Sequence, residues 1–143
     1  MSESSASALV RRFTEDVWNG RQLDLLDELA DDAYKLRNLS DDSVPVHTRA
    51  ELRTHIEEWL AAFPDLHMRE TDHLASGSRV VSVVRVTGTH TGEAFQGLRA
   101  VGASIDVPLV AVFDSAEGRL TGHGTLLDAR RLLQQLAPTA SSP

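Results

Sequence analysis

Apolar residues recur at helical spacing in the first part of the chain and in the denser pattern of strands after that. The densest run lies between Arg79 and Gly92, and its β-branched members are Val80, Val81, Val83, Val84 and Val86. This density is typical of a strand that is apolar on both faces and therefore covered on both sides. We expect the fold to be organised around this strand, which opens near Gly88 into a cleft or loop that contains His90.

Two helices are predicted at the start of the chain. The first carries an apolar set at helical spacing, which is Leu9, Val10, Phe13 and Val17. It stops at Asn19-Gly20, because both residues tolerate the left-handed conformation. The second helix is short and ends around Asp31-Asp32, and its apolar residues are Leu23, Leu26 and Leu29.

A third helix has the clearest start signal in the chain. Thr48 followed by Glu51 forms a capping box, in which each side chain satisfies a free amide at the helix start. Pro64 ends this helix. Its apolar face consists of Leu52, Ile56, Trp59, Leu60 and Phe63. We therefore predict a helix between Thr48 and Pro64 that packs one face against the rest of the fold.

Further strands are predicted on both sides of the central one. Residues 66–75 form a half-buried strand, whose alternation sets Leu66, Met68 and Leu74 against His67, Arg69 and His73. Residues 105–113 and 119–127 form a hairpin with its turn at 114–118. Residues 34–39 are either a short strand or an extended segment. A closing helix is marked by Leu132, Leu133 and Leu136.

The segment 91–104 carries three glycines around the apolar residues Phe95, Leu98 and Val101. This composition fits a lid over an apolar pocket, and equally a mobile end of a hairpin. Helices followed by an antiparallel meander and a terminal helix make an α+β fold. A curved sheet wrapped over helices leaves a cone-shaped cavity, which is where we expect a ligand.

Length and composition narrow the function. The 143 residues suit one domain, with residues 1–6 and 138–143 as flexible tails. The chain has no cysteine, which excludes disulfides and thiolate metal sites, and its net charge of −7 argues against nucleic acid. Neither a membrane-spanning run nor a signal peptide is present, so we expect a cytoplasmic protein. No His/carboxylate cluster with metal-site spacing and no glycine-rich phosphate-binding loop occurs.

Four parts of the chain carry a family resemblance that runs almost from end to end. They are residues 17–20 with 23–29, residues 59–66, the sequence Gly88-Thr89-His90-Thr91-Gly92-Glu93, and residues 118–120 with His123, Asp128 and Gln135-Leu136. Together they resemble the SnoaL-like polyketide cyclases of the NTF2-like group. The resemblance implies an NTF2-like α+β cone with its pocket between helices and sheet. It also implies a homodimer that binds a small polyketide substrate without metal or cofactor.

One position departs from the aldol-type cyclases of that family. In them, an aspartate two residues after the position of His123 serves as general acid and base, and this chain has Thr125 there. A threonine hydroxyl has no accessible pKa near neutrality, so it cannot take over proton abstraction. The departure puts the aldol mechanism in doubt and leaves the expected fold untouched.

Three residues are candidates for activating a substrate carbonyl, and each has a structural alternative. His123 shares a strand face with Thr121 and Thr125, and it either contacts substrate near its pKa or bonds a backbone carbonyl. His90 either positions a carbonyl or anchors a turn, and the anchor is favoured. Tyr34, the only tyrosine, either polarises a carbonyl or fills core volume.

Two aspartates are candidates for a relocated base. Asp128 directly precedes the closing helix, where an N-cap is the favoured interpretation. Asp106 alternates with apolar neighbours, so an exposed strand position is favoured, although burial in the cone would raise its pKa. The residues that we expect to bind substrate or line its pocket are Trp18, Asn38, Trp59, Phe63, Met68, Phe95, Leu98, Leu109 and Thr125.

The sequence thus predicts a polyketide cyclase that closes a carbon–carbon ring without a cofactor. Because the aldol aspartate is missing, closure by holding the substrate in a reactive conformation, with a Diels–Alder cycloaddition as the extreme case, fits best. Three alternatives stay open. They are an aldol cyclase with its base at Asp106 or Asp128, a cofactor-independent hydroxylase, and a non-catalytic binding module.

Overall fold

The computed structural model describes residues 5–137 of the chain. Residues 1–4 and 138–143, which include most of the expected tails, lie outside the described part. Two residues of the first expected tail belong to the fold, because helix α1 includes Ser5 and Ala6 and Ala6 is buried.

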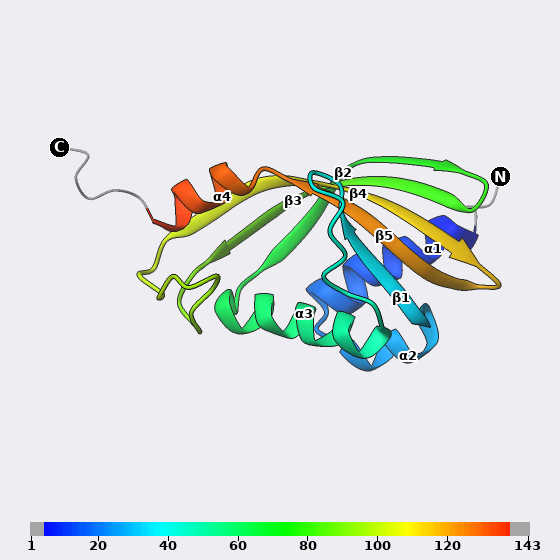
Figure 1. Ribbon diagram of the computed structural model, residues 1–143, viewed down its shortest axis with the longest axis horizontal. Helices are drawn as coiled ribbons and strands as arrows, with labels where there is room; N and C mark the ends of the chain where they lie inside the picture. The colour runs from blue at the N-terminus through cyan, green and yellow to red at the C-terminus, as the bar shows by residue number, and fades with distance from the viewer. Residues whose placement is uncertain (1–4, 138–143) are drawn as a thin grey trace.

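A curved five-stranded sheet forms one side of the molecule (Figure 1). Its strands are β1 (Ala30–Asn38), β2 (His67–Ser76), β3 (Arg79–Thr89), β4 (Ser104–Ala116) and β5 (Arg119–Leu127). The spatial order is β1-β5-β4-β3-β2, with β1 parallel to β5 and every other pair antiparallel. The ambiguous segment around Tyr34 is thus an edge strand, and the predicted α+β fold with a mostly antiparallel sheet is confirmed.

Helices from the first half of the chain cover one side of this sheet (Figure 1). They are α1 (Ser5–Arg12), the π-helical segment η1 (Phe13–Asn19), the 3₁₀ turn η2 (Leu23–Leu25), α2 (Leu26–Leu29) and α3 (Arg49–Ala62). The first predicted helix is therefore α-helical only in its first half. The last helix, α4 (Ala129–Leu136), contacts β4 near one end of the sheet.

The capping residues of α3 lie where the sequence predicts them. The Thr48 hydroxyl accepts a hydrogen bond from the Glu51 backbone N–H at 3.1 Å. The Glu51 carboxylate accepts from the backbone N–H of His47 at 2.6 Å, one residue before the amide of the standard box. The helix ends at Ala62, before Pro64, so both predicted boundaries are confirmed.

Strand β2 departs from the predicted alternation. Its pairing with β3 shifts register between Glu70 and Asp72, which is the signature of a bulge. A shift by one residue exchanges the two faces of a strand. Leu74 is consequently 69% exposed, whereas the side chain of His73 is mostly buried. The inward position predicted for Leu74 is therefore wrong.

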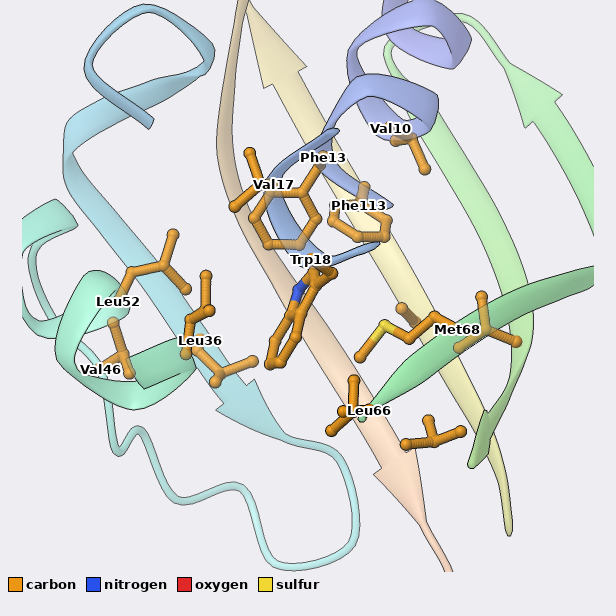
Figure 2. Close-up of a cluster of buried hydrophobic side chains, with 14 of the residues drawn as sticks. Val10, Phe13, Val17, Trp18, Leu36, Val46, Leu52, Leu66, Met68 and Phe113 are labelled. Carbon is orange, nitrogen blue, oxygen red and sulfur yellow. The ribbon is translucent and has the colours of Figure 1, made fainter. Parts of the chain in front are cut away.

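The core lies between the helices and the concave face of the sheet (Figure 2). From β3 it receives Val80, Val84 and Val86, each at most 5% exposed. Val81 and Val83 point the other way and are only half-buried. The expectation that β3 is covered on both sides is therefore wrong for the single chain, and its inward face alone contributes to the core.

Two side-chain amides join helical segments to strands. The Asn19 amide donates to the backbone oxygen of Met68 and accepts from the Met68 N–H, both at 2.8 Å. The Gln135 amide makes the same pair of contacts with the backbone of Asp106, at 2.8 and 3.1 Å. Each amide thus satisfies the backbone groups of a strand residue as a neighbouring strand would.

The loop after β3 is docked on the end of α3. The N–H of Gly92 donates to the Ala62 oxygen at 3.1 Å, and the N–H of Glu93 donates to the Ala61 oxygen at 2.9 Å. A Cβ atom on Gly92 would lie 1.8 Å from the Ala61 oxygen. No other residue fits this approach of two backbones without movement.

We expect Gly92→Ala to lower the free energy of unfolding by about 3 kcal/mol, because the loop must move off α3. Urea denaturation followed by circular dichroism measures this change. Gly97→Ala is the matched control, since φ at Gly97 is +80° but a Cβ there meets nothing within 4 Å. The control should cost only about 1 kcal/mol of backbone strain, and equal losses for the two variants would contradict the docking argument.

Candidate active site

A cavity of about 410 Å³ lies between the helices and the concave face of the sheet. Residues of η1, β1, α3, the four antiparallel strands and α4 contribute to its wall. Six of the nine residues predicted to bind substrate line it, and these are Trp18, Asn38, Trp59, Met68, Leu109 and Thr125. Phe63, Phe95 and Leu98 do not line it; they pack in or against the core.

The segment 91–103 contacts the cavity at one point. Phe95 packs on the Trp59 ring at 4.5 Å between centroids and edge-on against Phe63 at 5.3 Å. The next residue, Gln96, lines the cavity with a positive φ of 50°. The aromatic contacts hold this segment against α3, and its predicted role as a lid stays a prediction.

His123 is held on the cavity wall by Tyr34. The β1–β5 pairing places Leu36 opposite His123 and brings the two strands side by side. Tyr34 is fully buried, and its hydroxyl forms a short hydrogen bond with Nδ1 of His123. Burial raises the pKa of the Tyr34 hydroxyl well above its ordinary value, and the negative charge of Asp114 raises it further. The hydroxyl therefore keeps its proton.

The direction of this hydrogen bond follows from the other contacts of Tyr34. His123 is the only hydrogen-bond partner that the described chain provides for the hydroxyl. A buried hydroxyl proton without an acceptor is costly, so Tyr34 donates and Nδ1 accepts. The single ring proton of a neutral His123 then lies on Nε2. This tautomer is inferred from the hydrogen-bond pattern.

His123 is neutral over the physiological pH range. Its ring stacks on Phe113 at 4.6 Å and meets Phe13 edge-on at 5.8 Å. Burial, and secondarily the charge of a protonated His55, lower the pKa of His123 to about 3. The sequence-based expectation that His123 is near its pKa at neutral pH is therefore wrong. With Nδ1 occupied by Tyr34, His123 can offer a neutral N–H donor to a substrate carbonyl.

His55, which was not predicted from the sequence, also lines the cavity. It lies on α3 between Leu52 and Trp59, one helical turn from each, and both of these line the cavity as well. Burial lowers the pKa of His55 below its ordinary value, and the negative charge of Glu58 opposes part of this shift. Its spacing of three and four residues from Leu52 and Trp59 is the signal in the sequence that places His55 on the same face of the helix.

Within the described part of the chain, the cavity lining contains no aspartate, glutamate, lysine or arginine. Its two ionisable side chains are His55 and His123, and burial favours the neutral form of both. Thr14, Ser40, Ser43, Ser82 and Gln96 add uncharged polar groups that the sequence analysis also missed. The site can therefore donate and accept hydrogen bonds, but it holds no charged side chain.

The two aspartates considered as relocated bases do not line the cavity. Asp106 is exposed, and its carboxylate pairs with the Arg85 guanidinium at 2.8 Å. The Asp128 carboxylate accepts from the backbone N–H of Arg131 at 3.0 Å and caps α4. Asp106 is thus an exposed strand residue, and Asp128 is the N-cap of a helix.

His90 is fully buried but does not line the cavity. Its Nε2 lies 2.7 Å from the Glu93 backbone oxygen, and its ring packs 5.1 Å from that of Phe63. Its backbone N–H donates to the Ala103 oxygen at 2.8 Å, and its own oxygen accepts from Gly102 at 3.0 Å. These contacts make His90 an anchor that joins the two ends of the loop.

Comparison with known proteins identifies the family. The model of the SnoaL-like polyketide cyclases matches residues 8–136, nearly the whole chain. The chain belongs to this family. A search of proteins with curated function found no match. Among the described residues, no three histidine, aspartate or glutamate side chains gather as a metal site, and no helix is long and apolar enough to cross a membrane.

Solved structures show the same architecture over the full chain. A protein from Jannaschia sp. CCS1, described as a SnoaL-like polyketide cyclase, is 19% identical with a TM-score of 0.85 and covers 100% of this chain and 99% of its own. One from Acidithiobacillus ferrooxidans, described as a polyketide cyclase, is 27% identical with a TM-score of 0.79, covering 98% and 100%. AclR from Streptomyces galilaeus, described as a hydroxylase, is 23% identical with a TM-score of 0.80, covering 99% and 87%.

The neutral state of His123 predicts how stability depends on pH. Its folded-state pKa of about 3 is far below the ordinary value of about 6.5, so the unfolded chain binds the proton more tightly. This contribution is complete above about pH 6.5 and is lost as the pH falls toward 3. It amounts to about 1.4 kcal/mol per pH unit.

We expect His123→Gln, whose amide oxygen can still accept from Tyr34, to weaken this dependence. Between pH 7 and 5 the variant should lose about 2 kcal/mol less unfolding free energy than the wild type. Urea denaturation at the two pH values measures the difference. Equal losses in both proteins would contradict a neutral, buried His123.

Proposed function

We propose that the chain is a cofactor-independent polyketide cyclase that closes a carbon–carbon ring by holding its substrate in a reactive conformation. In an intramolecular cycloaddition, two carbon–carbon σ bonds form while three π bonds become one, and no atom enters or leaves. Such a reaction needs orientation more than proton transfer. A homodimer, which the family resemblance implies, stays a prediction.

The observation that carries this proposal is the uncharged cavity. An aldol cyclase needs a base that removes a proton from carbon, and the described residues place no carboxylate on the cavity wall. The family's aspartate position is occupied by Thr125, which does line the cavity. A volume of about 410 Å³ bounded by tryptophan, phenylalanine and aliphatic side chains supports binding of a folded, largely apolar molecule.

His123 has the chemistry of an electrophilic activator in this proposal. Its Nε2–H donor is fixed by Tyr34 and needs no change of protonation during the reaction. A donor aimed at a carbonyl conjugated with the reacting π system would lower the barrier by stabilising the charge that develops on oxygen. His55 offers a second neutral imidazole on the opposite, helical wall.

The mass of the product distinguishes the candidate reactions. The purified protein would be incubated, in air and under nitrogen, with the intermediate that accumulates when its gene is deleted in the producing host. We expect a new product of unchanged mass that forms in both atmospheres. Loss of one water would instead support an aldol condensation, gain of one oxygen a hydroxylase, and binding without conversion a non-catalytic module.

We expect His123→Phe to lower the turnover rate by about a hundredfold to a thousandfold, because it removes the hydrogen-bond donor and keeps an aromatic ring. Asp106→Asn is the control and should keep the wild-type rate, since Asp106 faces solvent and Arg85. Initial rates of product formation measure both variants. Loss of activity in Asp106→Asn would favour the aldol alternative with a relocated base.

A further inference from the structure

A hydrogen-bonded chain that begins at another strand of the cavity wall, β3, involves residues that the proposed reaction does not use. The Ser82 hydroxyl on β3 donates to Oε2 of Glu70 at 2.6 Å. The same oxygen lies 2.9 Å from Nδ1 of His73, and Nε2 of His73 lies 2.8 Å from the Ser7 hydroxyl on α1. Ser82 is only 1% exposed and lines the cavity, so this chain runs from the cavity wall to the first helix.

The contact with Glu70 fixes what Ser82 can do toward a ligand. A hydroxyl has one proton to donate and two lone pairs that can accept. The Ser82 proton is committed to a carboxylate, which makes this a strong, charge-assisted hydrogen bond. Within residues 5–137 no group donates to the Ser82 oxygen. Ser82 therefore faces the cavity as a hydrogen-bond acceptor.

Two polar groups of the cavity wall thus have donor or acceptor roles that are set by residues outside the cavity lining. Tyr34 makes His123 a donor, and Glu70 makes Ser82 an acceptor. Ser82 lies opposite Ala111, which lies opposite Thr125, two residues along β5 from His123. Strand spacing and rise then separate the Cα atoms of Ser82 and His123 by roughly 12 Å across the concave sheet.

We propose that the cavity selects a polyketide that carries a hydroxyl group as well as a carbonyl, with the hydroxyl donating to Ser82 while the carbonyl accepts from His123. This inference rests on the proposed function, because it names the substrate class of the same cavity. An ether or a methylated hydroxyl has no proton to donate, so its oxygen would place lone pairs against the lone pairs of the Ser82 oxygen. The site therefore disfavours it, because both oxygens stay without a donor.

The test compares two probes that differ in one hydrogen-bond donor. They are a methyl ketone of about ten carbons with a hydroxyl at the far end, long enough to reach both groups, and its methyl ether. The emission of Trp18 and Trp59, which are the two tryptophans of the chain and both line the cavity, reports binding. We expect the wild type to bind the hydroxy ketone about tenfold more tightly than the ether.

Replacement of single residues identifies the group responsible. Ser82→Ala should bind both probes with equal affinity, because the acceptor is gone. Ser115→Ala is the matched control: it removes another hydroxyl from the same sheet, one that donates to the Ser78 oxygen at 3.0 Å and does not line the cavity, and should keep the tenfold preference. Circular dichroism melting confirms that each variant folds.

Equal binding of the two probes by the wild type would overturn the proposal, even if a variant fails to fold. A preference that persists in Ser82→Ala would overturn it as well. The measurement involves no turnover, so it separates this inference from the proposed function. A cyclase without hydroxyl preference refutes only the inference, and a selective protein that converts no substrate refutes only the cyclase function.

Discussion

One buried hydrogen bond, from the Tyr34 hydroxyl to Nδ1 of His123, connects the architecture of this protein to its chemistry. It spans the parallel β1–β5 pair, so it exists only if the edge strand takes the observed register. Because Nδ1 accepts this hydrogen bond, the single ring proton of neutral His123 lies on Nε2, where it can be donated to another group. The hydrogen-bonding character of the cavity wall therefore depends on a tyrosine that does not line the cavity.

The cavity combines the hydrogen-bond donor of His123 with apolar walls that restrict the shape of a bound molecule. Correct orientation of reacting groups can supply about 7–11 kcal/mol of a barrier, whereas one well-placed donor supplies about 3–4 kcal/mol. For a reaction that moves no protons, the aromatic and aliphatic walls thus have the larger effect. The polar groups then mainly determine which conformation and which face of the substrate those walls receive.

The parts of the fold that depend on residues close together in the sequence could be predicted. The Thr48–Glu51 cap, the valine-rich strand and the last hairpin each follow from a few consecutive residues, although the hairpin turn is shorter than the predicted 114–118 and consists of Glu117 and Gly118. The bulge in β2 depends on pairing with β3, and the roles of Tyr34 and Ser82 depend on partners 89 and 12 residues away. His55 follows the helical period but is polar, so a search for apolar residues passes over it. Trp18 and Met68 were predicted at the cavity because large apolar side chains are typical of a core or a pocket wall.

The parallel β1–β5 pairing also has a consequence for biosynthesis. Ala30–Asn38 is translated before its partner, Arg119–Leu127, and 80 residues separate the two strands. Until β5 is present, β1 has no partner strand in the sheet and the Tyr34 hydroxyl lacks its acceptor on His123. The concave site can therefore close only after both strands have emerged, and a nascent chain without β5 would expose apolar surface that a chaperone could bind.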